Sequence, residues 1–95
     1  MTKTINLTFL DTQNHGYVEI AKHDFNSLGM NIRDFSQYSY HNQNCYYFEE
    51  DCDALKLHNF LKKQGCKINE DKKYVHYSHF NNLEFQRINT KQQGE

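Results

Sequence analysis

The sequence predicts a single α+β domain, in which an antiparallel sheet of four to six strands carries two helices on one face. Three observations support this fold class: short segments of alternating apolar and polar residues, two segments with helical spacing of apolar residues, and turn-forming residues between them. A chain of 95 residues has room for one hydrophobic core, so we expect one domain over residues 1–88. The polar residues 89–95 predict a flexible tail.

The first part of the chain predicts a hairpin followed by a helix. Apolar and polar residues alternate over Thr4–Leu10, and Tyr17–Ile20 is the expected return strand after a turn. Lys22–Leu28 is a short helix candidate that ends at Gly29, because glycine readily adopts the left-handed conformation found at helix C-termini. The predicted order is therefore strand, strand, helix.

The middle of the chain predicts the same order again. The expected strands are Phe35–Tyr40 and Cys45–Glu49, with a turn between them. A helix is expected over Cys52–Gln64, with Asp51 as its N-cap and Gly65 at its C-terminal end. Two such units side by side would place both helices on the same face of one sheet.

The last third of the chain predicts further strands. Cys66–Ile68 and Tyr74–Ser78 are expected to be separate strands, because the charged run Asn69–Lys73 between them resembles a turn. Leu83–Ile88 alternates in character and is expected to add an edge strand. The complete predicted order is ββα, ββα, then one or more strands.

Composition excludes several classes of protein. No stretch approaches the roughly 20 apolar residues that a membrane helix needs, and the N-terminal residues do not resemble a secretory signal. The net charge of -1 disfavours a protein that coats nucleic acid. The odd number of cysteines, without CxxC spacing, predicts free thiols and hence a reducing cytoplasm; they are Cys45, Cys52 and Cys66.

The densest run of charge is Glu49, Glu50, Asp51 and Asp53, four carboxylates within five residues. Alternation along the expected strand sends Glu49 and Glu50 to opposite faces. Acidic side chains at the start of a helix bind free N–H groups and complement the helix dipole, so helix capping is the simplest interpretation. The same carboxylates also fit an acidic surface that docks a basic partner. A metal site would need oxygen ligands that converge, and the sequence predicts neither a metal nor a cofactor.

No pattern in the sequence indicates an enzyme. Phosphate-binding loops, nucleophile elbows and kinase motifs are absent, and the six histidines lack regular zinc-binding spacing. Cys52 lies at an expected helix N-terminus, where a thiolate is favoured. An orienting residue and an oxyanion-hole motif do not accompany it. We therefore predict a protein without catalytic residues.

The tyrosines predict an interaction surface. Several fall on expected strands, and two short helices on one face would leave some of them on the open face of the sheet. Tyrosines that border the core with solvated hydroxyl groups are the alternative. The predicted partner-binding residues combine the tyrosines with the acidic run: Tyr38, Tyr40, Tyr46, Tyr47, Glu49, Glu50, Asp51 and Asp53.

Charge is distributed unevenly along the chain. Residues 1–54 hold 8 acidic and 3 basic residues, whereas residues 55–95 hold 4 acidic and 8 basic residues. A solvated helix face explains the lysines most simply. The alternative is a surface that binds nucleic acid through Lys62, Lys63, Lys67, Lys72 and Lys73.

Three stretches resemble a pattern found in small proteins of bacteriophages and other mobile elements: residues 15–20 (HGYVEI), 38–40 (YSY) and 47–54 (YFEEDCDA). The resemblance implies a non-catalytic protein that binds and inhibits a host defence complex, by analogy with anti-CRISPR proteins. The implied partner is a host protein or ribonucleoprotein, such as a Cas protein, in the bacterial cytoplasm. A small nucleic-acid-binding regulatory module is the alternative function. A homodimer remains open, since exposed aromatic strands also form dimer edges.

Overall fold

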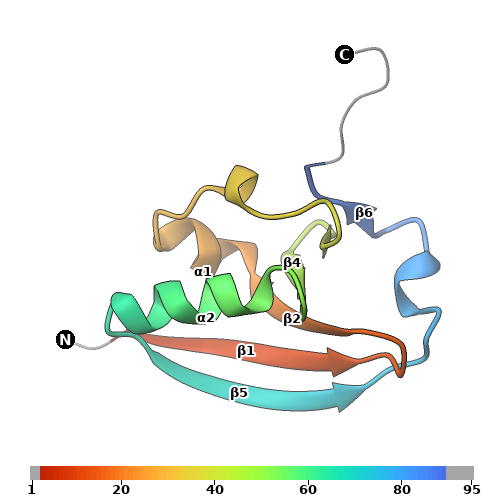
Figure 1. Ribbon diagram of the computed structural model, residues 1–95, viewed down its shortest axis with the longest axis horizontal. Coiled ribbons are helices and arrows are strands. Elements are labelled where there is room, and N and C mark those ends of the chain that lie inside the picture. Colours follow the sequence, from red (N-terminus) through yellow and green to blue (C-terminus); the bar gives the residue numbers. More distant parts are fainter. Residues whose placement is uncertain (1–2, 90–95) are drawn as a thin grey trace, which may run out of the picture.

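The structure is a computed structural model that describes residues 3–89, and it confirms the α+β fold class. In chain order the elements are β1 (Thr4–Asp11), β2 (Gly16–Ala21), α1 (Lys22–Ser27), η1 (Ile32–Asp34), β3 (Tyr40–His41), β4 (Cys45–Glu49), α2 (Ala54–Lys63), β5 (Lys67–Tyr74), η2 (His79–Asn81) and β6 (Gln86–Arg87). The strands form one sheet in the order β5-β1-β2-β4-β3-β6. Figure 1 shows α1 and α2 over the same face of this sheet, and both contribute side chains to one core.

The main core lies between the two helices and the sheet face beneath them. The ring of Phe25 in α1 packs against Tyr46 of β4 at 4.8 Å between centroids, and Phe35 stacks on Phe48 at 4.3 Å. These contacts hold α1 over the centre of the sheet. The most deeply buried side chains of this core are Ile5, Leu7, Val18, Ile20, Phe25, Phe48, Leu57 and Leu61.

The opposite face of the sheet is also covered, although the sequence predicted an open face. Part of the chain between β5 and β6 packs against it, and Phe80 in η2 forms a second core with Leu10, Tyr17 and Tyr47. The rings of Tyr17 and Phe80 lie 4.5 Å apart between centroids. Because both faces carry apolar residues, the sheet forms the middle layer of the molecule.

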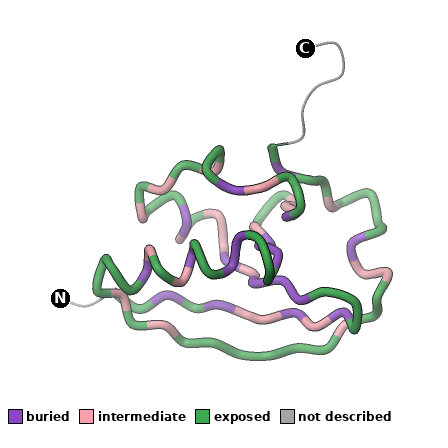
Figure 2. Tube along the Cα trace, in the orientation of Figure 1, coloured by how far each residue is buried: buried purple, intermediate pink, exposed green. Residues whose placement is uncertain are grey.

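β5 is one continuous strand at the edge of the sheet, and the sequence prediction for this region was wrong. The expected strands Cys66–Ile68 and Tyr74–Ser78, with a turn over Asn69–Lys73, are replaced by eight residues that pair with β1 in parallel. The sheet is therefore mixed rather than antiparallel. Figure 2 shows β5 exposed along most of its length, and an edge strand that is exposed on both faces lacks the alternation of apolar residues that identifies a strand.

The segment predicted as the strand Phe35–Tyr40 is largely irregular, and only its last residue belongs to a strand, β3. Ser36 and Ser39 in this segment hydrogen-bond to the carboxylate of Asp53, which draws the chain away from the straight path of a strand. The expected edge strand Leu83–Ile88 is likewise reduced to the two residues of β6, which pair with β3.

The last described residue, Asn89, contacts the segment that contains η1. Asn89, assigned to the tail by the sequence, donates hydrogen bonds from its side chain to the carbonyl oxygens of Ile32 at 2.6 Å and Phe35 at 2.8 Å. The other predicted tail residues, 90–95, lie outside the described residues. Within the described part of the chain, no helix is long and apolar enough to cross a membrane.

Candidate functional site

A cleft of about 250 Å³ opens where the turn between β1 and β2, the end of β4 and the chain leading into α2 come together. The three stretches that carry the resemblance, residues 15–20, 38–40 and 47–54, all contribute to its walls. Sequence segments far apart in the chain therefore meet at one place. The side chains that line the cleft are His15, Tyr17, Tyr38, Glu49, Asp51, Cys52 and Arg87.

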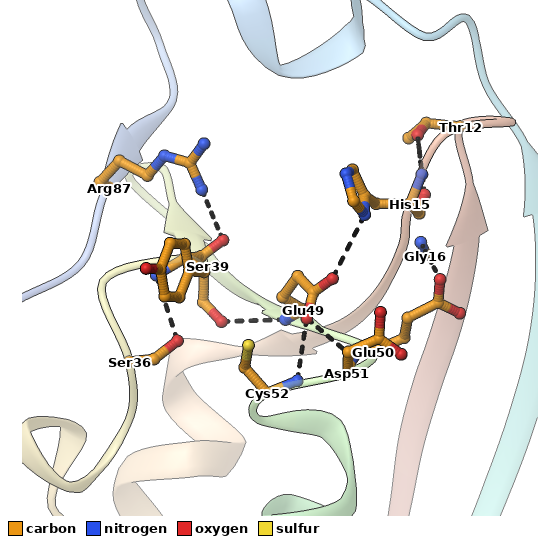
Figure 3. A network of polar contacts seen from close by, with 11 residues as sticks. Thr12, His15, Gly16, Ser36, Ser39, Glu49, Glu50, Asp51, Cys52 and Arg87 are labelled. Carbon is orange, nitrogen blue, oxygen red and sulfur yellow. Dashed lines mark hydrogen bonds and ion pairs between the residues drawn. The ribbon is translucent and has the colours of Figure 1, made fainter.

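Glu49 occupies the centre of this cleft (Figure 3). It is only 6% exposed, and its Oε1 atom accepts hydrogen bonds from the backbone N–H groups of Asp51 at 2.7 Å and Cys52 at 2.9 Å. Its Oε2 atom lies 3.4 Å from Nδ1 of His15. Glu49 therefore stabilises the turn that precedes α2, a role that the sequence assigned to Asp51 as an N-cap.

The start of α2 differs from its prediction in position as well. The helix begins at Ala54 rather than Cys52, with Asp53 as the N-cap residue. It ends before Gly65, as predicted, and the φ of +74° at Gly65 is the left-handed conformation typical of a glycine at a helix C-terminus. Asp53 is 1% exposed, and its carboxylate accepts hydrogen bonds from the N–H and hydroxyl of Ser36 and from the hydroxyl of Ser39. Asp53 thus stabilises the loop before β3 through these hydrogen bonds. Because its side chain is buried, it is not accessible to a partner.

Glu50 and Asp51 are the exposed members of the acidic run. The Oε2 atom of Glu50 accepts a hydrogen bond from the N–H of Gly16 at 2.9 Å. The close approach requires glycine at this position, because a Cβ atom on Gly16 would lie 2.1 Å from the ring of Phe9 and 2.7 Å from Oε1 of Glu50. The carboxylates of the run thus divide into two buried and two exposed groups, as the alternation of Glu49 and Glu50 predicted for the first pair.

The four predicted tyrosines do not form one surface. Tyr46 faces α1 and the main core, whereas Tyr47 is 4% exposed within the second core on the opposite face. Tyr40 is half-buried and stacks on Phe80 at 4.6 Å. Tyr38, which is 54% exposed and lines the cleft, is the one member of the four that faces solvent.

Four residues of the cleft were not predicted as site residues: His15, Tyr17, Cys52 and Arg87. The turn that carries His15 is fixed by the Thr12 hydroxyl, which donates to the carbonyl oxygen of His15 at 2.7 Å and accepts from its N–H at 3.2 Å. The Arg87 guanidinium donates to the carbonyl oxygen of Tyr38 at 2.6 Å and lies 4.2 Å from the centre of the Tyr40 ring. The histidine just before a glycine in a turn was the available signal for His15.

Burial and neighbouring charges disfavour ionisation of the Tyr17 hydroxyl and the Cys52 thiol, which both line the cleft. Burial and the neighbouring Tyr40 raise the pKa of Tyr17 to about 12, although Arg87 opposes this shift. Desolvation and the hydrogen-bonded carboxylate of Glu49 raise the pKa of the Cys52 thiol. Cys52 therefore lacks the lowered pKa of an activated cysteine nucleophile.

The lysines predicted for nucleic-acid binding lie in two separate groups. Lys62 and Lys63 end α2 and Lys67 begins β5, whereas Lys72 and Lys73 lie at the other end of that strand. Lys67 and Lys72 are five positions apart along the extended strand, which separates the two groups by about 17 Å. The ammonium group of Lys72 also lies 3.9 Å from a carboxylate oxygen of Asp11.

Comparison of the chain with protein-family models, with curated proteins and with solved structures finds no match.

Proposed function

We propose that the chain is a non-catalytic binding protein of a bacteriophage or other mobile element, and that it inhibits a bacterial defence complex in the way anti-CRISPR proteins do. The observation that carries this proposal is that an exposed aromatic ring, Tyr38, and an exposed carboxylate, Asp51, line the same cleft, with the exposed Glu50 next to Asp51 in the chain. Tyr38, Glu50 and Asp51, here called the docking rim, are the three predicted partner-binding residues that face solvent.

The chemistry of the docking rim suits a basic partner. Carboxylates attract the arginine and lysine surfaces on which ribonucleoprotein complexes hold their nucleic acid, and such attraction steers association and competes with phosphate. Tyr38 adds a large, rigid side chain of the kind enriched in interfaces.

Buried residues hold the docking rim in place. Glu49 fixes the backbone of Asp51, Asp53 fixes the loop that carries Tyr38, and Gly16 binds the carboxylate of Glu50. A surface whose geometry is set before binding loses less conformational entropy when a partner docks. The buried carboxylates Glu49 and Asp53 therefore act as positioning residues rather than as contacts.

The proposal is tested by capture of defence complexes from bacterial lysate with the tagged full-length chain. We expect the double variant E50K/D51K to lose the captured complex, because charge reversal turns attraction into repulsion at a basic surface. The matched control E70K/D71K changes the same charge on the exposed edge strand β5 and is expected to capture the complex as the natural sequence does. Binding should also weaken as salt is added.

Two outcomes contradict this function. If E50K/D51K is folded and still captures the complex, the docking rim is not the interface. If the chain recovers nucleic acid alone, and variants at Lys62 and Lys63 lose it, the alternative function as a nucleic-acid-binding module replaces the inhibitor.

A further inference from the structure

Three side chains with metal-binding atoms converge in the cleft. His15 comes from the turn between β1 and β2, Glu49 from the end of β4, and Asp51 from the chain before α2. One ligand atom of each lies within 4.8 Å of the others. We propose that these three residues form a binding site for one divalent transition-metal ion of the Zn²⁺ type.

The spacing of His15 and Glu49 fits this ion. Nδ1 of His15 and Oε2 of Glu49 are 3.4 Å apart, which is longer than an ordinary hydrogen bond between nitrogen and oxygen. Two ligands that each lie about 2.1 Å from a tetrahedral zinc ion are about 3.4 Å apart. His15 and Glu49 therefore stand at the separation that the ion requires.

Glu49 is held in the manner of a metal ligand. More than nine-tenths of its surface is buried, and its Oε1 atom is held by two backbone N–H groups, so the carboxylate presents Oε2 toward His15 (Figure 3). Hydrogen bonds to the remaining atom of a ligand fix its orientation and are typical of metal sites. A buried carboxylate beside the second carboxylate of Asp51 is also a favourable environment for a cation.

The ligand types select the class of metal. Mg²⁺ and Ca²⁺ prefer sites made of oxygen ligands alone, whereas an imidazole nitrogen favours zinc and its neighbours in the transition series. Three protein ligands leave at least one coordination position for water on the open side of the cleft. The inference goes beyond the proposed inhibitor function and does not depend on it, although Asp51 belongs to both sites.

The test is a titration of Zn²⁺ into the metal-free, full-length chain in competition with a chromogenic chelator. We expect one ion per chain, and excess Mg²⁺ or Ca²⁺ should not displace it. His15→Ala and Asp51→Asn are each expected to weaken Zn²⁺ binding by about tenfold or more. His23→Ala is the matched control, because His23 is exposed on α1, and we expect its affinity to equal that of the natural sequence.

A second measurement distinguishes loss of the metal site from misfolding of a variant. Zn²⁺ should raise the thermal unfolding midpoint of the natural sequence and of His23→Ala, because a ligand that binds the folded state stabilises it. The rise should be lost in His15→Ala. The site is refuted if the natural sequence binds no stoichiometric Zn²⁺, if His15→Ala binds as tightly as His23→Ala, or if binding depends on Cys45 and Cys66 instead. Partner capture by E50K/D51K is a separate readout, so failure of one proposal is distinguishable from failure of the other.

Discussion

At the residue scale, Tyr17 links the cleft to the second core and makes the stability of the fold sensitive to alkaline pH. Its ring packs on Phe80 while its side chain lines the cleft. Burial and Tyr40 raise the pKa of its hydroxyl from 10.0 to about 12. The folded state therefore stabilises the neutral hydroxyl of Tyr17 relative to the ionised form.

The sign of the resulting pH dependence follows from this pKa. Between pH 10 and pH 12 the folded chain retains a proton that the unfolded chain has lost, so the free energy of unfolding falls as pH rises through that range. We expect a loss of about 2–3 kcal/mol from Tyr17. Cys45 and Tyr47 have raised pKa values as well, so they add to the same decline. Tyr17→Phe removes only the Tyr17 hydroxyl, and the difference between the two proteins therefore gives the contribution of that hydroxyl.

The measurement is urea denaturation of both proteins at a series of alkaline pH values. Tyr17→Phe should show a flatter decline than the natural sequence over this range. Parallel declines in the two proteins would show that the Tyr17 hydroxyl is not the group responsible.

Single residues also show where sequence reasoning stops. The alternation of Glu49 and Glu50 predicted opposite orientations, and the structure buries the first and exposes the second. The partners of Asp53 were not predictable, because Ser36 and Ser39 lie 17 and 14 residues away in the chain. A local pattern shows that a carboxylate lies near the start of a helix, but it does not show which groups elsewhere in the chain hydrogen-bond to that carboxylate.

At the element scale, β5 shows that a strand can lack a recognisable pattern. β1, β2 and β4 were predicted because one or both of their faces are buried, which leaves an apolar signature. β5 is a parallel edge strand with charged residues on both faces, and its charged centre resembles a turn. Its pairing with β1 depends on residues about 60 positions earlier in the chain, which no local pattern reports.

The parallel register of β5 predicts an alternation in amide hydrogen exchange. The N–H of Lys67 donates to the carbonyl of Lys3 and that of Val75 to the carbonyl of Asp11. Successive N–H groups in a strand point to opposite sides. The odd-numbered amides therefore bond to β1, and the even-numbered amides face the open edge of the described sheet.

We expect slow exchange at residues 69, 71 and 73 and exchange at least about tenfold faster at residues 68, 70 and 72. Amide exchange followed by NMR measures this directly. Slow exchange at all six positions would mean that another chain covers the edge. Fast exchange at all six would support the turn that the sequence indicated.

At the scale of the whole molecule, the chain between β5 and β6 completes the fold. It buries the second face of the sheet through Phe80, and it leads into β6, whose Arg87 forms a wall of the cleft. The sequence did not predict this cover because the residues that pack on the sheet, Val75, Phe80 and Phe85, lie five positions apart, which matches the period of neither a strand nor a helix. The cleft thus depends on packing between the two ends of the described chain.

This dependence is tested by Phe80→Ala. The ring of Phe80 contacts Tyr17, Tyr40 and Tyr47, and removing a buried phenylalanine leaves a cavity that costs about 3–5 kcal/mol of unfolding free energy. Leu83→Ala is the matched control from the same segment, since Leu83 is 97% exposed and its truncation should change stability by less than about 0.5 kcal/mol. Urea denaturation gives both values. If the two substitutions lower the free energy of unfolding by equally small amounts, this segment does not stabilise the second face of the sheet. The position of Arg87 in the wall of the cleft would then need another explanation.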